Sequence, residues 1–253
     1  RQITELLTQY GEIGAIWFDG WWDHDSDSTA FDWELPYQYE LVHRLQPACL
    51  VGNNHHQTPF EGEDIQIFER DVPGQNKAGL SGQEISRLPL ETCQTMNGMW
   101  GYKVADQNYK STTELIRLLV QTSGKGANLL LNIGPQPDGT LPETALSRLS
   151  DIGQWLSANG DAIYGTESGG YADGEKVVTT RKGDRLFIHI IDETVGSLNI
   201  PIDGKVKSVV SFAGQTPLDY KFRDGHLTME VIVPANTPDY IIEVTLRYTP
   251  QAS

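Results

Sequence analysis

The feature that most constrains the fold is a change of hydrophobic pattern near residue 165. Before that residue, short apolar runs alternate with amphipathic segments of helical period, which is typical of β-α units on a parallel sheet. After it the helical period disappears, and short runs of alternating polar and apolar residues follow one another. The sequence therefore predicts an α/β fold followed by an all-β fold.

The α/β part begins with a buried strand over residues 13–18 that ends at Asp19. A helix over 35–45, with Pro36 in its first turn, leads to a second strand over 49–53. Three further strands and two further helices are predicted, the strands over 65–68, 99–102 and 127–133 and the helices over 112–122 and from 140 onward. The count of parallel strands is thus four or five.

Six short strands with turn residues between them predict a small antiparallel β-sandwich, over residues 176–180, 185–191, 197–200, 207–212, 227–233 and 240–246. A glycine-rich stretch precedes the first of them, and we interpret it as a linker. The expected organisation is a first domain over 1–165, a linker over 166–174 and a β-sandwich domain over 175–253.

The chain carries 34 Asp and Glu against 19 Lys and Arg, and its formal net charge is −15. This excess of negative charge repels phosphate backbones and anionic lipids, so neither nucleic acid nor a membrane is an expected partner. No apolar stretch is long enough to span a membrane, and the first residues lack signal-peptide character. Cys49 and Cys93 lie in or beside apolar runs, which predicts two buried free thiols.

The segment with the strongest functional signal is YGEIGAIWFDGWWDHD, residues 10–25. The carboxyl ends of the strands of a parallel barrel form its active-site face, and Asp19 stands at such an end, followed by Gly20 and two Trp residues. Indole rings stack on the C–H faces of a pyranose, and a carboxylate can attack its C1 atom. This pattern indicates a sugar site. The alternative is that Asp19 only caps the loop after its strand.

The acidic loop that follows has a partial likeness to a calcium-binding loop. Asp23, Asp25 and Asp27 are followed by Glu34 at the twelfth position. The sixth position is Ser28, however, where the sharp turn of such a loop needs Gly. We therefore predict an acidic, solvated rim without a metal ion.

The segment WFDG at residues 17–20 resembles the nucleophile motif of the α-L-fucosidases of glycoside hydrolase family 29. Three longer segments resemble the same family in order and spacing, namely residues 62–74, 90–103 and 124–166. The resemblance covers essentially the whole chain. It is strong through residue 166 and weaker in the sandwich.

The resemblance implies the C-terminal half of a (β/α)8 TIM-like barrel with a C-terminal antiparallel β-sandwich. It also implies a retaining exo-α-L-fucosidase that removes terminal α-linked L-fucose from fucosylated oligosaccharides or glycoconjugates, without a cofactor, through a fucosyl-enzyme intermediate on Asp19. Eight strands close such a barrel, so the N-terminal half is expected either as a segment of the same protein or as a partner chain. By the same resemblance, export to the bacterial periplasm or outside the cell is expected.

The second catalytic group, the acid/base, lies on a variable loop in this family. Glu69 is the first candidate, because the spacing from Asp64 to Glu69 resembles the segment that carries the acid/base in some relatives. Glu63 is the runner-up and Glu61 is third. Close relatives are expected to have Glu at the position of Gln75, so the acid could also belong there.

Five residues are predicted to bind the sugar. Trp17 and Trp22 flank Asp19 in the sequence, and His55 and His56 follow a predicted strand at its carboxyl end. Adjacent side chains diverge, so only one of the two histidines is expected to face a given ligand. Trp100 resembles an aromatic residue that lines the sugar site in the family, and a buried core Trp is the alternative.

A different class of function also fits the sequence. A non-catalytic, barrel-derived carbohydrate-binding protein would keep the aromatic side chains and lose the acid. Gln75 favours that alternative and Asp19 favours the enzyme.

Overall fold

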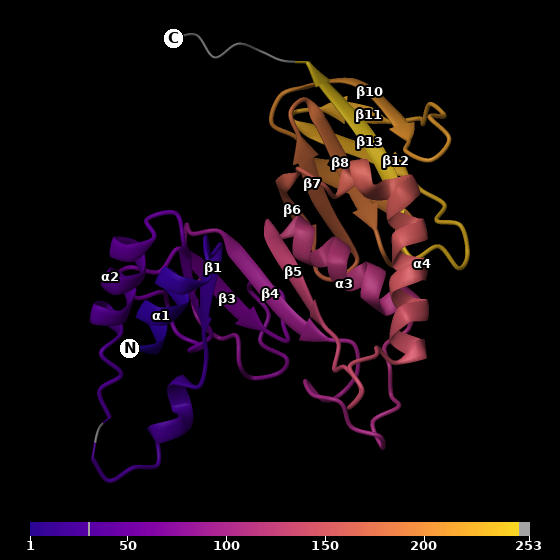
Figure 1. Cartoon of the computed structure of the whole chain (residues 1–253). Helices are drawn as coiled ribbons and strands as arrows, with labels where there is room; N and C mark the ends of the chain where they lie inside the picture. The colour runs from indigo at the N-terminus through magenta and orange to yellow at the C-terminus, as the bar shows by residue number, and fades with distance from the viewer. Residues whose placement is uncertain (30, 248–253) are drawn as a thin grey trace, which may run out of the picture. The chain divides into compact units, whose positions relative to one another are not determined.

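The computed structural model describes residues 1–29 and 31–247 (Figure 1). The chain divides into two compact units, of which the first comprises Arg1–Gln94 and Ala127–Leu130 and the second the other described residues. The predicted fold class is confirmed: a parallel half-barrel sheet is followed by antiparallel sheets.

The first unit is built on one sheet with the strand order β1-β2-β3-β4-β5. The first four strands pair in parallel, each with the next in the sequence. The bounds are β1 Ala15–Phe18, β2 Leu50–Asn53, β3 Ile65–Glu69, β4 Leu90–Thr95 and β5 Ala127–Asn132. The predicted strands of this sheet are confirmed apart from the fourth.

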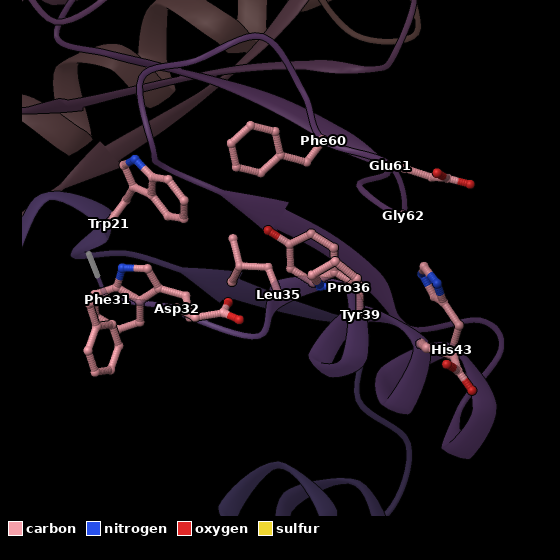
Figure 2. A pocket seen from close by; sticks show the side chains of 12 residues that line it. Trp21, Phe31, Asp32, Leu35, Pro36, Tyr39, His43, Phe60, Glu61 and Gly62 are labelled. Carbon is pink, nitrogen blue, oxygen red and sulfur yellow. The ribbon is translucent and has the colours of Figure 1, made fainter. Parts of the chain in front are cut away.

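Two helices, α1 Gln2–Gln9 and α2 Leu35–Leu45, pack against each other beside β1 (Figure 1). The apolar face of each helix packs on the side chains that β1 and β2 direct toward the helices. Leu7 and Val42 of the helices share this core with Ile16, Phe18 and Val51 of the strands. The aromatic residues Trp21 and Phe60 pack on the same cluster, close to Tyr39 of α2 (Figure 2).

The other face of this sheet begins with Ala15 and Trp17, because successive strand residues point to opposite faces. Trp17, Leu50 and Leu130 keep 39%, 44% and 47% of their surface exposed. Asp19, the next residue of the same parity, continues this face beyond the end of β1. The open face is therefore apolar along the strands and polar at their carboxyl ends.

The fourth strand was predicted at 99–102, and this is wrong: the strand is Leu90–Thr95. Only Leu90 and Cys93 are apolar in LETCQT, so the buried strand has no apolar run. The segment 99–102 forms a loop instead. The carboxylate of Asp106 accepts the backbone N–H groups of Gly98 and Met99 at 2.9 and 2.7 Å and holds that loop closed.

The second unit contains two long helices, α3 Thr112–Gly124 and α4 Glu143–Asn159, as predicted to within a few residues. A capping box opens α3, in which Ser111 and Glu114 each bind the other's backbone N–H. The short 3-10 helix η2, Gly160–Ala162, continues α4. A second 3-10 helix, η1, Trp21–His24, lies in the first unit shortly after Asp19.

Two antiparallel sheets complete the second unit, with the orders β10-β13-β8-β7-β6 and β11-β12-β9. Ile188 and Ile242 of one sheet share a buried core with Ile200 and Leu227 of the other. The bounds are β6 Glu167–Asp173, β7 Val177–Lys182, β8 Arg185–Ile190, β9 Ser197–Pro201, β10 Lys205–Ser211, β11 Lys221–Arg223, β12 His226–Glu230 and β13 Tyr240–Arg247. The predicted β-sandwich is confirmed.

The stretch predicted as a linker, residues 166–174, is strand β6 for most of its length. It pairs with β7 across an irregularity between Ser168 and Ala172. A Cβ at Gly169 would lie 2.5 Å from Oγ1 of Thr179, so the strand can approach β7 there only with glycine. Glycine has no side chain to show alternation, which is why the sequence pattern did not indicate a strand. The division into domains at 165 and 175 stays a prediction.

Cys49 and Cys93 are buried and free, as predicted. No helix among the described residues is long and apolar enough to cross a membrane. Within the same residues, no group of three or more His, Cys, Asp or Glu side chains is arranged to hold a metal ion.

Candidate active site

Polar side chains gather at the carboxyl ends of β1, β2 and β3, in the first unit. Asp19 follows β1 directly, Asn54 follows β2, and Glu69 is the last residue of β3. The pairing registers bring these ends to one edge of the sheet, since Phe18 lies opposite Asn53 and Asn53 opposite Gln66. The fold therefore assembles two carboxylates and an amide from residues 50 positions apart in the chain.

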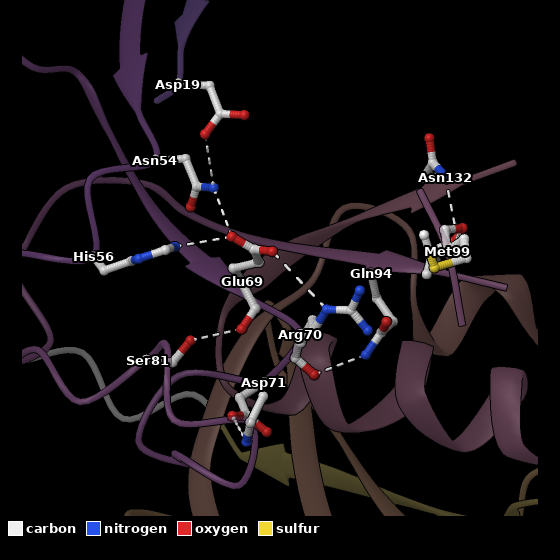
Figure 3. Close-up of polar contacts among 12 residues, drawn as sticks. Asp19, Asn54, His56, Glu69, Arg70, Asp71, Ser81, Gln94, Met99 and Asn132 are labelled. Carbon is white, nitrogen blue, oxygen red and sulfur yellow. Dashed lines mark hydrogen bonds and ion pairs between the residues drawn. The ribbon is translucent and has the colours of Figure 1, made fainter. Parts of the chain in front are cut away.

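The amide of Asn54 bridges the two carboxylates (Figure 3). Its Nδ2 donates to Oδ1 of Asp19 at 3.3 Å and to Oε2 of Glu69 at 2.8 Å. Two bonds of 3.3 and 2.8 Å to one nitrogen limit the separation of those two carboxylate oxygens to about 6 Å. The backbone N–H of Asn54 also donates to the carbonyl of Phe18, which fixes this residue beside Asp19.

The two carboxylates differ in their surroundings. Asp19 is exposed, whereas Glu69 is buried, with 8% of its surface exposed. Nε2 of His56 lies 2.9 Å from the same Oε2 of Glu69 that Asn54 binds, and Nε of Arg70 lies 3.9 Å from Oε1 (Figure 3). Asp19 is therefore open to a ligand, while Glu69 is held on both oxygens.

His56 and Arg70 both have left-handed backbone conformations, with φ of 58° and 64°. Such φ values are uncommon outside glycine, and strained residues of this kind cluster at functional sites. Here both residues place their side chains on Glu69.

Two indole rings stand near the carboxylates. Trp22 stacks on the ring of His56 with centroids 4.8 Å apart and planes 6° from parallel. Since His56 also contacts Glu69, these side chains form a chain of contacts from Trp22 to Glu69. Trp17 lies on the open face of β1, and its Nε1 donates to Oε1 of Glu91 at 2.9 Å. Both rings keep 39% of their surface exposed, so each can contact a ligand.

The side chains of His55 and His56 diverge, as predicted. Nε2 of His55 lies 2.9 Å from Oε1 of Glu63, and the hydroxyl of Tyr39 donates to the same oxygen at 2.8 Å. Both members of the His55–Glu63 pair are buried. Tyr39 belongs to α2, so these contacts direct Glu63 toward the helix-covered side of the sheet, and burial raises the pKa of the Tyr39 hydroxyl. The predicted runner-up is thus engaged in the core.

Cys93 lies beneath the carboxylates, opposite Glu69 in the register of β3 and β4. Burial raises the pKa of its thiol to about 12, and the negative charges of Glu69, Glu91 and Asp19 act in the same direction. A thiol in this condition stays protonated and is a poor nucleophile at neutral pH. Cys93 therefore contributes packing.

The remaining candidates have other places. Gln75 lies half-buried in the loop after β3, where its backbone N–H donates to the carbonyl of Val72 at 3.0 Å. Glu61 is exposed and lines a separate cavity. Trp100 belongs to the second unit, where its carbonyl accepts from the amide of Asn132 at 2.8 Å. Its participation in a sugar site stays a prediction.

Sequence reasoning did not identify Asn54 or Arg70. The signal for Asn54 was present, because it follows a predicted strand at the same edge of the sheet as Asp19. The signal for Arg70 was its position directly after Glu69, where its positive charge lies beside the candidate acid.

Known proteins with similar sequences are α-L-fucosidases. The model of the family described as "Alpha-L-fucosidase" matches residues 1–161. The chain is 44% identical over 174 residues to an α-L-fucosidase of Dictyostelium discoideum, which covers 66% of this chain and 34% of that protein. It is 34% identical over 240 residues to human tissue α-L-fucosidase, covering 87% of this chain and 47% of that one.

The structure is similar to that of α-L-fucosidase isoenzyme 1 from Paenibacillus thiaminolyticus. The TM-score is 0.75 at 30% sequence identity, and the match covers 98% of this chain and 61% of the bacterial one. This chain thus spans between about a third and three fifths of the length of these three proteins.

Proposed function

Because the chain belongs to the α-L-fucosidase family, we propose that it carries the catalytic carboxylates of a retaining exo-α-L-fucosidase. Asp19 is the nucleophile and Glu69 the acid/base. The observation that carries this assignment is the pair of hydrogen bonds from one amide, that of Asn54, to both carboxylates.

The separation of the carboxylates favours retention. Retaining glycosidases hold their two carboxyl groups about 5–5.5 Å apart, whereas inverting ones need about 6.5–9.5 Å to admit a water molecule. The shared amide limits the bonded oxygens of Asp19 and Glu69 to about 6 Å. The two bonded oxygens can therefore lie at the shorter, retaining spacing.

Each step of the reaction has a group to perform it. In the first step an oxygen of Asp19 attacks C1 of the fucose while Glu69 gives its proton to the glycosidic oxygen. The bond from C1 to that oxygen breaks, the alcohol leaves neutral, and fucose remains as an ester of Asp19. In the second step Glu69 takes a proton from water, whose oxygen attacks C1 and releases the carboxylate of Asp19.

The surroundings suit these two roles. An exposed carboxylate can approach C1, and the amide of Asn54 holds it beside the acid. Glu69 is buried and held at Oε2 by Asn54 and His56, which orients Oε1, the oxygen that only the longer contact with Arg70 engages among the described residues. Trp22 and Trp17 offer indole faces for the sugar.

The substrate is a fucosylated oligosaccharide or glycoconjugate. The rest of the barrel, a segment of the same protein or a partner chain, covers the open face on which Trp17, Leu50 and Leu130 are exposed. The complete protein is exported, by its likeness to the family.

The test uses the complete gene product that contains this chain, with 4-nitrophenyl α-L-fucoside as substrate. Asp19→Ala should abolish turnover without unfolding the protein, because an exposed residue at a strand end leaves no core cavity. Asp25→Ala, an exposed aspartate in the loop that follows, is the matched control and should keep full activity. If Asp19→Ala retains more than about a tenth of kcat, a loss of under about 1.4 kcal/mol, Asp19 is not the nucleophile.

A further inference from the structure

A cavity of about 580 Å³ lies in the first unit, apart from the carboxylate pair, between α2 and the loops at 31–33 and 60–62 (Figure 2). Its lining is rich in aromatic side chains, and apart from Trp21 none of its residues belongs to the segments that carry the carboxylate pair. The lining comprises Trp21, Phe31, Asp32, Trp33, Leu35, Pro36, Tyr39, Glu40, His43, Phe60, Glu61 and Gly62.

Aromatic pairs form two walls of this cavity. Trp21 and Phe60 meet edge to face with centroids 5.4 Å apart, and Phe31 meets Trp33 in the same way at 4.9 Å. Tyr39 of α2 is a buried member of the lining, whereas Phe31 keeps 50% of its surface exposed. Aromatic rings gathered around one cavity, with at least one of them exposed, are a usual means of binding an apolar face.

Carboxylates supply the polar groups at the rim. Glu61 is exposed, and Asp32 accepts the backbone N–H of Glu34 at 2.8 Å through Oδ1. The one possible cation of the lining, His43, already contacts Asp64 at 2.8 Å. This rim repels anions and accepts hydrogen bonds from hydroxyl or ammonium groups.

The wall that contains Glu61 has a fixed place against α2. Gly62 has a φ of 94°, and a Cβ built there would lie 3.2 Å from Cβ of Tyr39. The loop can approach the helix this closely only with glycine at that position. The cavity is therefore formed by the fold and does not depend on the rotamer of one exposed side chain.

A small cavity of about 130 Å³ lies next to this region, beside the nucleophile. It is lined by Asp19 and shares Trp21, Trp33 and Leu35 with the larger one. Asn53 also lines it, and its Oδ1 has no hydrogen-bond partner among the described residues although the side chain is 95% buried. A buried carbonyl without a donor indicates room for a hydroxyl group or a water molecule.

We propose that the larger cavity is a second saccharide-binding site, which takes a neutral pyranose of the glycan other than the fucose that is cleaved. Aromatic rings stack on the C–H face of such a sugar, and the carboxylates of Asp32 and Glu61 accept its hydroxyl groups. The volume suits one or two sugar rings and exceeds what a single ammonium group needs. The choice of a sugar over an organic cation rests on the proposed function.

The test measures binding of lactose and of N-acetyllactosamine to the complete gene product by isothermal titration calorimetry. Neither probe contains fucose, so the result is independent of hydrolysis. Phe31→Ala should raise the dissociation constant of the better probe at least tenfold, and Glu61→Gln should raise it about threefold. Tyr37→Ala, which removes an equally exposed ring of α2 outside the cavity, should leave it within twofold.

Thermal melting of each variant shows whether the protein stays folded, and choline serves as the cation probe. Absence of saturable binding for both sugars overturns the proposal, as does equal loss in Phe31→Ala and Tyr37→Ala. Tighter binding of choline than of either sugar also overturns it, in favour of a cation site. An inactive protein that still binds a sugar through Phe31 would contradict the proposed hydrolysis and leave this site established.

Discussion

Removing the side chain of Asn54 should lower activity tenfold to hundredfold, although Asn54 itself forms and breaks no bond in the reaction. Its Nδ2 donates to Glu69 at 2.8 Å and to Asp19 at 3.3 Å, and hydrogen bonds to charged groups contribute about 1.5–3 kcal/mol. The longer bond is weak, so one bond of full strength is lost in Asn54→Ala. We therefore expect kcat/KM for 4-nitrophenyl α-L-fucoside to fall about 10- to 100-fold.

The neighbouring residue provides the control. Asn53 is buried to the same degree, but its Nδ2 donates to the hydroxyl of Tyr39 at 2.7 Å. Asn53→Ala should therefore cost about 1 kcal/mol of stability, the usual worth of a neutral hydrogen bond, and change kcat/KM less than threefold. Of these two asparagines, only Asn54 contacts the carboxylates of Asp19 and Glu69. Equal losses of activity in the two variants would refute the positioning role.

Two further predictions concern the second unit, and both use the complete gene product. His189 and Asp239 form a fully buried pair at 2.7 Å, so Asp239→Ala should lower the free energy of unfolding by about 3–5 kcal/mol in urea; a loss below about 1 kcal/mol would contradict this. The hydrogen bond from Arg185 holds the pKa of Glu243 below its usual range, so its contribution to stability is present at neutral pH and is lost as the pH falls through the lowered pKa. The difference in melting temperature between wild type and Glu243→Gln should therefore be largest near pH 7 and close toward pH 3, and a difference independent of pH would exclude this linkage.

The strands and helices that the sequence predicted well are those with an apolar run or a strong terminus. The helix 35–45 has Pro36 at its start and an apolar stripe, and the strand at 127 has a continuous apolar run. Strand β4 lacks such a run because Glu91 binds Trp17 on the open face, while Thr92 and Gln94 bind backbone carbonyls of the segment that follows Glu69. The site itself thus removed the pattern by which the strand is recognised.

The candidate site could be predicted in part for a similar reason. Asp19 directly follows a predicted strand, so its position alone indicates a role. Glu63 and Glu69 are six residues apart on one segment, and only the fold separates them, by directing one to Tyr39 and the other to Asn54. His56, which stacks on Trp22, has a positive φ, and that backbone conformation cannot be predicted from the residue type.

The configuration of the products formed with azide tests the central assignment most directly. Each displacement at C1 inverts the configuration of that carbon. Azide that replaces a missing nucleophile makes the only displacement, so the product is inverted. Azide that attacks the fucosyl-enzyme makes the second displacement, so the original configuration is restored. The account predicts β-fucosyl azide from Asp19→Gly and α-fucosyl azide from Glu69→Ala, both made by the complete gene product from 4-nitrophenyl α-L-fucoside. If Glu69→Ala gives no azide product and Glu63→Ala or a variant at Gln75 gives the α-azide, Glu69 is not the acid/base; if Asp19→Gly gives none and keeps hydrolysing the substrate, Asp19 is not the nucleophile.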